Sequence, residues 1–330
     1  MTTICVDAMG GDESPEVVCE GIAMALAADE DLTVLVAGND EIVTPFCQQT
    51  ERAIPLVTTE VIGMAEHPAE AVRKKKDSSI VRGCAAVRAG EAEGFFSAGS
   101  TGAIFAAATM GVGRTKGIKR PCLASFLPGL DGHQTVFCDL GANADVRPEM
   151  IVQFAQMGAA YAQVELGIKN PRVGLLSNGE EETKGSEMAL AFHEALAGAS
   201  CGFAGNAEGT DLLLGNFDVI VSDGFTGNVA LKTLEGTAKF ILKSLKASIE
   251  HSLRGKIGAL LLKPALKDIQ AMLSGDDHGG AILLGLKAPV LIGHGATSAQ
   301  AVAAGTRACA SMVRGGLVDK VANTLAQSEQ

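Results

Sequence analysis

The chain has 330 residues and a formal net charge of −11, and its residues are 47% apolar, 20% charged and only 4% aromatic. This length exceeds that of a typical single domain, and the apolar fraction is sufficient for a large buried core. The negative charge and the absence of tryptophan argue against a nucleic-acid partner, because a phosphate backbone would be repelled and bases would find few aromatic rings to stack on.

Short apolar runs alternate with helical patterns along the chain. The predicted strands are 3–6, 32–37, 94–97, 122–126, 135–140, 172–176, 202–204, 218–222 and 288–292. The predicted helices include 15–27, 102–111, 149–166, 185–196 and 299–313. Such alternation predicts a three-layer α/β/α fold, in which helices cover both faces of a mostly parallel sheet. We expect one catalytic domain over residues 1–330.

Glycine-rich polar turns follow five of these strands, where the functional groups of α/β sheets collect. The turn residues that we single out are Asp7, Gly10 and Gly11; Ser97, Gly99, Ser100, Thr101 and Gly102; Asp139 and Asn143; Asn178 and Lys184; and Asp223, Gly224 and Asn228. Glycines at a helix start let backbone N–H groups approach an anion closely. Each turn alone could be ordinary helix capping, but together they predict one shared anion-binding cleft.

Nucleotide-binding and hydrolase signatures do not accompany these turns. The turn 97–102 has neither the lysine of a Walker A loop nor a G-x-G-x-x-G pattern, and no histidine accompanies a G-x-S-x-G elbow. His294 follows the last predicted strand and could orient an anion or act as an acid or base, although a capping or core role is the simpler interpretation.

Residues 229–275 have a different composition from the rest of the chain. A helical pattern runs from Lys232 to Lys267 with eight basic and two acidic residues. One basic face of it contains Lys239, Lys243 and Lys246. Within this stretch, the apolar run that follows residue 256 contains Ile257, Leu260 and Leu261. We predict a projecting helical hairpin whose basic face suits an acidic protein or an anionic membrane, although a solvated helix with its tip in a dimer contact explains the pattern equally well.

The eight cysteines include no C-x-x-C pair and no spacing typical of metal ligands, so we expect reduced thiols and no zinc site. Met1 leads into an apolar run without a basic leader, and the uncharged stretch 95–113 is too rich in Ser, Thr and Gly to span a bilayer. These features predict a cytoplasmic protein, and we expect neither a metal nor a cofactor.

The polar turns lie within longer motifs. These are VDAMGGD (6–12), RKKKDSSIV (73–81), SAGSTGA (97–103), GRTKGIKRP (113–121), DLGAN (139–143), PRVGLLSNGEEETKG (171–185), SDGFTGNVALKTLEG (222–236), LLKPALK (261–267) and GGAILLGLKAPV (279–290). In this order they resemble the phosphate:acyl-carrier-protein acyltransferase family (PlsX) of bacterial phospholipid synthesis, from residue 6 to about 313. The family usually has Asn at the position of Ser100 and often serines near Ala296 and Thr297.

The resemblance implies a fold related to phosphotransacetylase and to the isocitrate and isopropylmalate dehydrogenases. It also implies a homodimer with a protruding helical pair, whose tip associates peripherally with the inner face of the cell membrane. The implied reaction moves a fatty acyl group from acyl carrier protein to inorganic phosphate. A glycerol-3-phosphate acyltransferase would then use the acyl phosphate.

The polar turns suit this chemistry. Phosphate is largely dianionic near neutral pH and thiolates leave readily, so the reaction needs a cation and N–H donors more than a strong acid or base. We expect Lys184 to face phosphate and Asn228 to donate to phosphate or to the developing oxyanion. The carboxylates of Asp7, Asp139 and Asp223 would hold turns and orient Lys184. A second basic group, which could meet carrier or substrate phosphate or simply be solvated, contains Lys75, Lys76 and Arg120.

Three other functions remain open from the sequence. The first is a phosphate acetyl- or butyryltransferase that acts on coenzyme A thioesters. The second is an NAD(P)-linked hydroxyacid dehydrogenase on the related fold, and the third is a non-catalytic lipid- or anion-binding regulator at the membrane.

Overall fold

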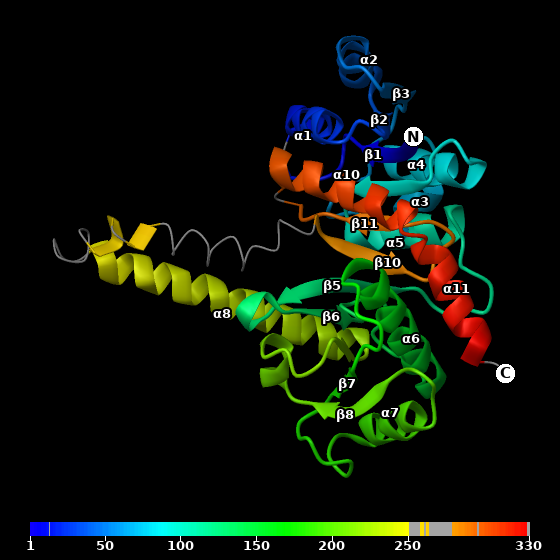
Figure 1. The fold of residues 1–330 in the computed structure, drawn as a ribbon. Coiled ribbons are helices and arrows are strands. Elements are labelled where there is room, and N and C mark those ends of the chain that lie inside the picture. Colours follow the sequence, from blue (N-terminus) through cyan, green and yellow to red (C-terminus); the bar gives the residue numbers. More distant parts are fainter. Residues whose placement is uncertain (13, 251–257, 261, 264–278, 296, 329–330) are drawn as a thin grey trace.

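The structure is a computed structural model that describes residues 1–12, 14–250, 258–260, 262–263, 279–295 and 297–328. Within these residues eleven strands form one sheet in the order β3-β2-β1-β4-β11-β10-β5-β6-β9-β7-β8 (Figure 1). The strands are β1 (Thr2–Asp7), β2 (Leu32–Gly38), β3 (Ala53–Val57), β4 (Gly94–Ser97), β5 (Cys122–Pro128), β6 (Gln134–Cys138), β7 (Val173–Leu176), β8 (Phe203–Ala207), β9 (Val219–Val221), β10 (Ala281–Leu284) and β11 (Val290–Ile292).

The sheet consists of two parallel blocks that run in opposite directions. The first block is β3-β2-β1-β4-β11, and the second is β6-β9-β7-β8. Between them, β10 pairs antiparallel with both β11 and β5, and β5 pairs antiparallel with β6. The prediction of a mostly parallel sheet is confirmed. Because of this reversal, however, the strands of the first block and those of the second block have their carboxyl ends at opposite edges of the sheet.

The pleat of each strand separates two cores. On β1, Ile4 and Val6 belong to one buried cluster, whereas Cys5 between them belongs to the other, because successive side chains of a strand point to opposite faces. The helices are α1 (Pro15–Ala28), α2 (Asp40–Gln49), α3 (Pro68–Lys74), α4 (Ser79–Ala89), α5 (Thr101–Gly111), α6 (Pro148–Glu165), α7 (Glu187–Ala197), α8 (Gly224–Glu250), α10 (Ala299–Arg314) and α11 (Leu317–Ser328), with short 3₁₀ turns η1 (Leu130–Gly132) and η2 (Gly209–Leu213).

Helices cover both faces of the first block, as expected for a three-layer fold. Side chains of α1 and α10 pack with Ile4 and Val6, and those of α4 and α5 pack with Cys5. On the second block, α6 lies against β6 and β9 and also packs with α7 and α11. Almost all of its middle turns are buried, from Phe154 to Ala162.

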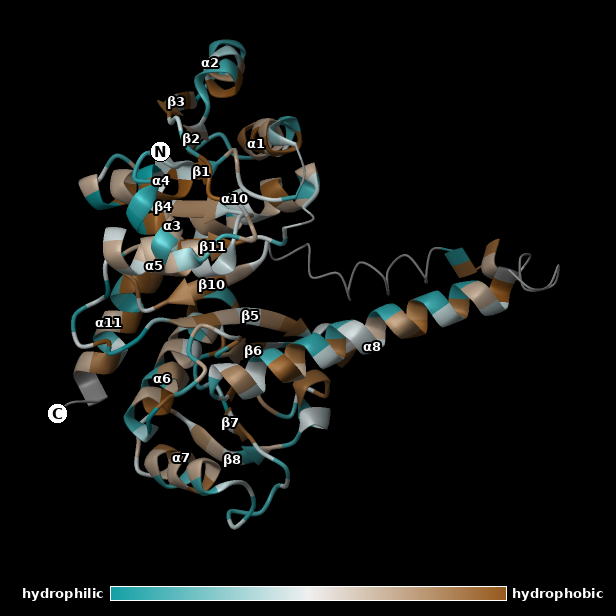
Figure 2. Cartoon of the chain, turned by 180° about the vertical axis from the view of Figure 1, so that it is seen from behind, coloured by the Kyte–Doolittle hydropathy of each residue, from teal (hydrophilic) through white to brown (hydrophobic). Residues whose placement is uncertain are grey.

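Helix α8 departs from this layered arrangement. It is one continuous 27-residue helix that projects away from the sheet (Figure 1). Figure 2 shows hydrophobic and hydrophilic residues interleaved along its projecting part. No described helix is both long and apolar enough to cross a membrane.

Only part of the predicted hairpin falls within the described residues. Its first helix corresponds to α8. Leu260 lies in the short helical stretch 258–260, and 72% of it is exposed. Ile257, Leu261 and the predicted second helix lie outside the described residues, so the hairpin over 229–275 stays a prediction.

Candidate functional site

The polar turns form two groups, one at the end of each parallel block. The turns after β1, β4 and β11 contact one another, and so do the turns after β6, β7 and β9. Among the described residues, no hydrogen bond joins a turn of one group to a turn of the other. The strand direction reverses between the blocks, so the five turns do not all lie at equivalent strand ends, and the single shared anion-binding cleft stays a prediction.

The first group is centred on a buried carboxylate. Asp7 is only 1% exposed, and its carboxylate accepts hydrogen bonds from Ser97 Oγ (2.7 Å) and from the backbone N–H of Met9 (3.0 Å). Ser97 Oγ in turn accepts from the N–H of Gly99 at 3.0 Å. Burial raises the pKa of Asp7 above its ordinary value, and these hydrogen bonds oppose the rise. We call Asp7, Ser97, Gly99 and Gly10 the Asp7 cluster.

Gly10 lies so close to the other residues of the Asp7 cluster that no side chain fits there. A Cβ atom on it would lie 2.5 Å from Asp7 Oδ2 and 2.8 Å from the backbone nitrogen of Gly99. The neighbouring Gly11 has φ +112°, and the N–H of Asp12 donates to the Gly295 carbonyl at 2.7 Å. Glycine is required at these positions for close backbone approach and for positive φ.

The start of α5 and the loop after β11 complete the first group. The N–H of Gly293 donates to the Ser97 carbonyl at 2.9 Å, so the loop that carries His294 packs beside the turn after β4. His294 itself is exposed, which excludes a core role. Ser100 is buried at the N-terminus of α5, which begins with Thr101 and Gly102, but its side chain makes no capping hydrogen bond.

The second group contains a buried carboxylate that is used entirely to hold a turn. Asp139 is fully buried and accepts from the N–H groups of Leu123 (2.8 Å), Ala142 (3.1 Å) and Asn143 (2.7 Å), and from Asn143 Nδ2 (2.9 Å). Burial raises the pKa of Asp139, against these hydrogen bonds. The Asn143 carbonyl accepts from the N–H of Gly224 at 2.8 Å, which fixes the first turn of α8 on this turn.

Asn228 lies one turn along α8, over Gly141. A Cβ atom on Gly141 would lie 2.6 Å from Asn228 Nδ2, and Gly141 has φ +128°. Asn228 is exposed, and its side-chain amide has no hydrogen-bond partner within the described part of the chain. The amide is therefore free to donate to a ligand above the 139–143 turn.

A cavity of about 290 Å³ lies where β7 and β9 end and where α7 and α8 begin. Its walls are formed by Leu175, Leu176, Ser177, Asn178, Gly185, Ser186, Met188, Ala189, Phe192, Ser222, Asp223 and Thr226. Two helix N-termini meet there, and helix N-termini attract anions through their free N–H groups and the helix dipole. The predicted residues Asn178 and Asp223 both line this cavity.

Two serine hydroxyls in this cavity lack partners. Ser177 Oγ and Ser222 Oγ are buried and have no hydrogen-bond partner among the described residues, and Ser222 is only 2% exposed. A buried polar group without a partner costs about 1–3 kcal/mol, so these hydroxyls are suited to bind a ligand. Sequence reasoning did not single them out. The available signal was that each serine directly follows the last residue of a strand.

Lys184 lies in the turn that leads into this cavity, although it is not one of the residues that line it. Lys184 directly precedes the cavity residue Gly185. Its side chain packs over Gly179, because a Cβ atom added to Gly179 would lie 2.7 Å from Lys184 Cγ. Its side chain is exposed and pairs with no carboxylate among the described residues. Asp223, by contrast, accepts from Thr226 N (2.8 Å) and Oγ1 (2.7 Å), so it caps α8 and does not pair with Lys184 as predicted.

The second predicted basic group is divided. Lys75 Nζ binds the Glu66 carboxylate and the Val61 carbonyl, both at 2.7 Å, which fixes the loop before α3. Lys76 and Arg120 are exposed, and Arg120 lies in a separate segment that leads into β5.

Metal ligation and thiol chemistry find little support. Within the described residues no group of three His, Cys, Asp or Glu side chains is placed to hold a metal ion. All eight cysteines are free, and burial raises the pKa of Cys19 and of Cys47 to about 11.

The arrangement of the sheet and helices is shared with solved structures of two phosphate-dependent acyltransferases by name, and this likeness concerns the fold. It is similar to a phosphotransacetylase from Streptococcus pyogenes (TM-score 0.61, 18% identity, covering 95% of this chain and 94% of that one). It is also similar to a branched-chain phosphotransacylase from Enterococcus faecalis (TM-score 0.60, 15% identity, 95% and 99% coverage). The chain thus has the α/β/α fold of the phosphotransacetylases, as its motifs implied.

The model of the fatty acid synthesis protein family matches residues 2–320, and the chain belongs to that family. Relatives include a phosphate acyltransferase of Levilactobacillus brevis, 48% identical over 91% of this chain and 88% of that protein. A phosphate acyltransferase of Anoxybacillus flavithermus is 42% identical over 99% of both chains. The resemblance carried by the motifs is confirmed.

Proposed function

We propose that this chain is a phosphate acyltransferase that moves a fatty acyl group from acyl carrier protein to inorganic phosphate. The products would be an acyl phosphate and the free carrier, in the first step toward phosphatidic acid. The observation that carries the proposal is the cavity where two helix N-termini and two unpartnered serine hydroxyls meet, with the exposed Lys184 in the turn that leads into it. The family and the phosphate acyltransferase relatives support the same reaction.

Phosphate would bind in the cavity at the ends of β7 and β9. The hydroxyls of Ser177 and Ser222 would donate to its oxygens, as would free N–H groups at the start of α7. Lys184 would balance its charge from the edge of the cavity, and the Asn178 amide could donate alongside. Glutamates 180–182 precede Lys184 in the same turn. The positive charge of Lys184 would therefore offset the repulsion between these carboxylates and the bound phosphate.

The reaction itself would require mainly positioning. A phosphate oxygen would attack the thioester carbonyl carbon and form a C–O bond, and the C–S bond would break as the thiolate leaves and takes a proton from water. Asn228, whose amide is free above Gly141, would donate to the oxyanion that develops on the carbonyl oxygen. The carboxylates of Asp139 and Asp223 serve as turn and cap acceptors, so neither would act as the base.

The first group of turns would contribute a second anion-binding element. Ser100, Thr101 and Gly102 start α5, and the Ser100 side chain makes no capping bond. The backbone of Gly10, Gly11 and Gly99 and the exposed His294 lie on the adjoining turns. We assign this element to the substrate's other polar groups and not to the attacking phosphate. The carboxylate of Asp7 lies at the centre of these turns, and when ionised it would repel phosphate.

The projecting helix α8 would contact an anionic membrane surface or an acidic carrier. Lys239, Lys243 and Lys246 are exposed on it, and Phe240 and Ile241 are also exposed. Basic and apolar side chains interleaved on one helix suit the interface of an anionic bilayer. We propose peripheral association with the inner face of the membrane, assembly as a homodimer, and delivery of the product to a glycerol-3-phosphate acyltransferase.

One assay tests the proposed reaction. Purified protein would be incubated with a long-chain acyl carrier thioester and phosphate, and hydroxylamine would trap acyl phosphate as the hydroxamate. Phosphate-dependent hydroxamate is expected with the carrier thioester. Faster turnover of acetyl- or butyryl-coenzyme A would favour the short-chain phosphate acyltransferase instead, and absence of product with every thioester would reject the proposal.

A further inference from the structure

Six exposed cationic side chains gather where the chain enters β5, leaves β6 and leaves β10. We call this surface the basic rim. It consists of Arg114, Lys116, Lys119, Arg120, Arg147 and Lys287. The segments that carry these side chains, 113–121, 144–149 and 285–289, contain only two acids, Asp145 and Glu149. In a chain with a net charge of −11, this is a local excess of positive charge.

The topology of the sheet brings these segments together. Strand β10 ends at Leu284 opposite Cys122, where β5 begins, and β6 ends at Cys138 opposite Ala124. The three segments therefore lie at one edge. Direct contacts join two of them, because the N–H of Lys287 donates to the Gly113 carbonyl at 3.0 Å and Arg114 forms a β-bridge with Leu286.

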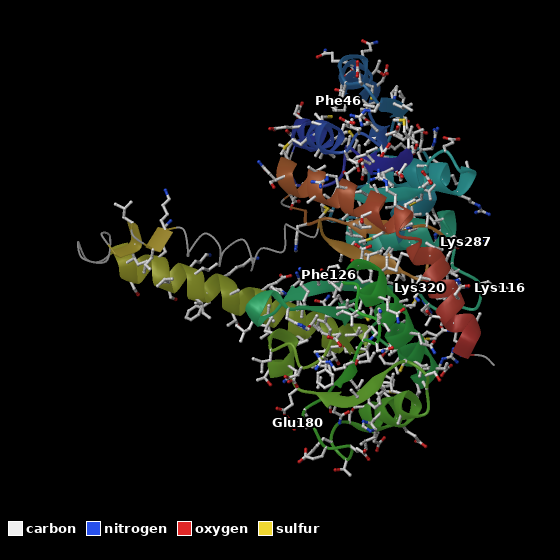
Figure 3. The ribbon with its side chains drawn as sticks, viewed as in Figure 1. Phe46, Lys116, Phe126, Glu180, Lys287 and Lys320 are labelled. Atoms are coloured by element: carbon white, nitrogen blue, oxygen red, sulfur yellow. The ribbon has the colours of Figure 1, made fainter. Side chains whose placement is uncertain are left out.

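This edge is also the edge of the cavity group. Asn143 Nδ2 donates to the carbonyl of Pro121, next to Arg120, at 2.8 Å. The Asn143 carbonyl accepts from the N–H of Gly224, which directly follows the cavity residue Asp223. Only the 139–143 turn and the start of α8 thus separate the rim from the cavity. Figure 3 shows Lys116 and Lys287 on the side of the molecule opposite the projecting end of α8.

Most of the positive charge on the rim is not neutralised by carboxylates of the residues that the structure describes. Glu149 pairs with both Lys119 and Arg147, each at 3.3 Å. Among the described residues no carboxylate lies within ion-pair distance of Arg114, Lys116, Arg120 or Lys287. The Arg114 guanidinium instead donates to the Lys119 carbonyl, which stiffens the rim's main loop.

We infer that the basic rim is the docking surface for the acidic carrier protein, which would present its thioester arm to the cavity across the 139–143 turn. This inference rests on the proposed function. It differs from the expectation that the carrier binds along α8, because the lysines of α8 lie on a projecting helix, whereas the rim adjoins the candidate site. Unpaired surface cations attract an acidic partner by long-range steering and raise its association rate.

Charge reversal tests the inference with two substrates. The rim variant would be K116E/R120E/K287E, and the matched control K74E/K169E/R307E carries the same charge change on exposed cations outside the rim. Each would be assayed with an acyl carrier thioester and with the neutral pantetheine thioester of the same acyl chain. We expect the rim variant to lower kcat/KM for the carrier thioester about tenfold or more and to leave the pantetheine thioester unaffected. The control should change neither.

The contrary outcomes are distinct. An equal loss with both substrates, or no loss with the carrier thioester, would overturn the inference. A carrier-specific loss in K239E/K243E/K246E without one in the rim variant would place the carrier on α8. If wild-type protein forms no acyl phosphate from either thioester, the proposed function fails, and titration of labelled acyl carrier protein into the wild type and the rim variant still tests the docking surface. Equal affinities there would overturn it.

Discussion

The Asp7 cluster and the cavity at the ends of β7 and β9 share a local plan but use their polar atoms differently. Both follow short buried strands, contain glycine and serine, and lead into helices. In the Asp7 cluster the polar atoms satisfy one another, since Ser97 Oγ both donates to Asp7 and accepts from Gly99. In the cavity, Ser177 Oγ and Ser222 Oγ have no partner among the described residues.

This difference predicts a structural role for the side chains of Asp7 and Ser97 and a binding role for the two cavity serines. A buried hydroxyl with a partner stabilises the fold, whereas one without a partner costs free energy unless a ligand supplies the hydrogen bond. The comparison therefore predicts that substitutions in the Asp7 cluster change mainly stability, and that substitutions around the cavity change mainly activity.

The largest expected effect comes from Lys184→Ala. Removal of the unpaired cation beside the proposed phosphate site should lower kcat/KM by about 10²–10³-fold, because charge that develops in the transition state loses its counter-charge. The melting temperature should not change, since the side chain is exposed and has no carboxylate partner among the described residues. Lys74→Ala, on an exposed lysine of α3, serves as the control in the hydroxamate assay. Comparable loss in both variants would contradict the assigned role.

The serines give the most direct test of the comparison. Ser177→Ala/Ser222→Ala should lower activity about tenfold to a hundredfold, the value of one or two hydrogen bonds to a charged ligand, with no loss of stability. Ser97→Ala should instead reduce the free energy of unfolding by about 1–3 kcal/mol, because Asp7 and Gly99 both lose a buried partner. Urea unfolding together with specific activity would measure both. A loss of stability in the Ser177/Ser222 variant, together with a loss of activity but not of stability in the Ser97 variant, would refute the distinction.

Glycine substitutions should reproduce the contrast on a smaller scale. Gly10→Ala places a methyl group 2.5 Å from Asp7 Oδ2 and 2.8 Å from the Gly99 nitrogen, so we expect destabilisation of about 1–3 kcal/mol. Gly179→Ala meets only flexible side chains, with Lys184 Cγ 2.7 Å away. It should displace Lys184 and lower activity several-fold at unchanged melting temperature. Thermal denaturation and kinetics on the two variants would decide between these outcomes.

The smallest expected effect is a pH dependence that belongs to the Asp7 cluster. The folded-state pKa of Asp7 lies above its ordinary value of 3.8, so the folded protein holds this proton more tightly than the unfolded chain does. The stabilisation from Asp7 is complete below pH 3.8 and is lost as the pH rises through the folded pKa, with a slope of at most about 1.4 kcal/mol per pH unit.

The Asp7→Asn variant lacks this titration. The stability of the wild type relative to the variant should therefore fall as the pH rises above about 4. Asp139, which is also shifted upward, is present in both proteins and cancels in the difference. A difference in unfolding free energy that is constant between pH 4 and 7 would count against a raised pKa.

Much of the fold could be predicted from periodicity, but the division into two groups could not. The buried strands with β-branched residues, such as Leu32–Gly38, and the helices with strong apolar stripes were visible in the sequence. Strand β10, only four residues long, lies within the apolar run 279–290 and was not predicted. An apolar run does not reveal whether a strand pairs parallel or antiparallel, and β10 takes part in the reversal between the blocks.

Edge elements were missed for a related reason. Strand β3 contains Pro55 and is partly exposed. Its sequence therefore lacks the continuous apolar run of a buried strand, as is typical of strands at the edge of a sheet. The turn residues were easier to find, because Gly, Asn, Asp and Ser after a buried strand have few other uses. Their hydrogen-bond partners depend on contacts between distant segments, so the sequence could not distinguish Ser97, which is satisfied, from Ser222, which is not.

One continuous helix connects the cavity to the projecting end of the molecule. Twenty-seven residues at 1.5 Å each make α8 a rod about 40 Å long. Its first two turns carry Thr226 in the cavity wall and Asn228 above Gly141. A lever of this length magnifies motion, so a slight tilt at the base sweeps the far end across several ångströms. Conversely, a contact that holds the far end of α8 would restrain the wall of the cavity. A displacement of the far end of α8 would therefore move the part of the cavity wall that α8 forms.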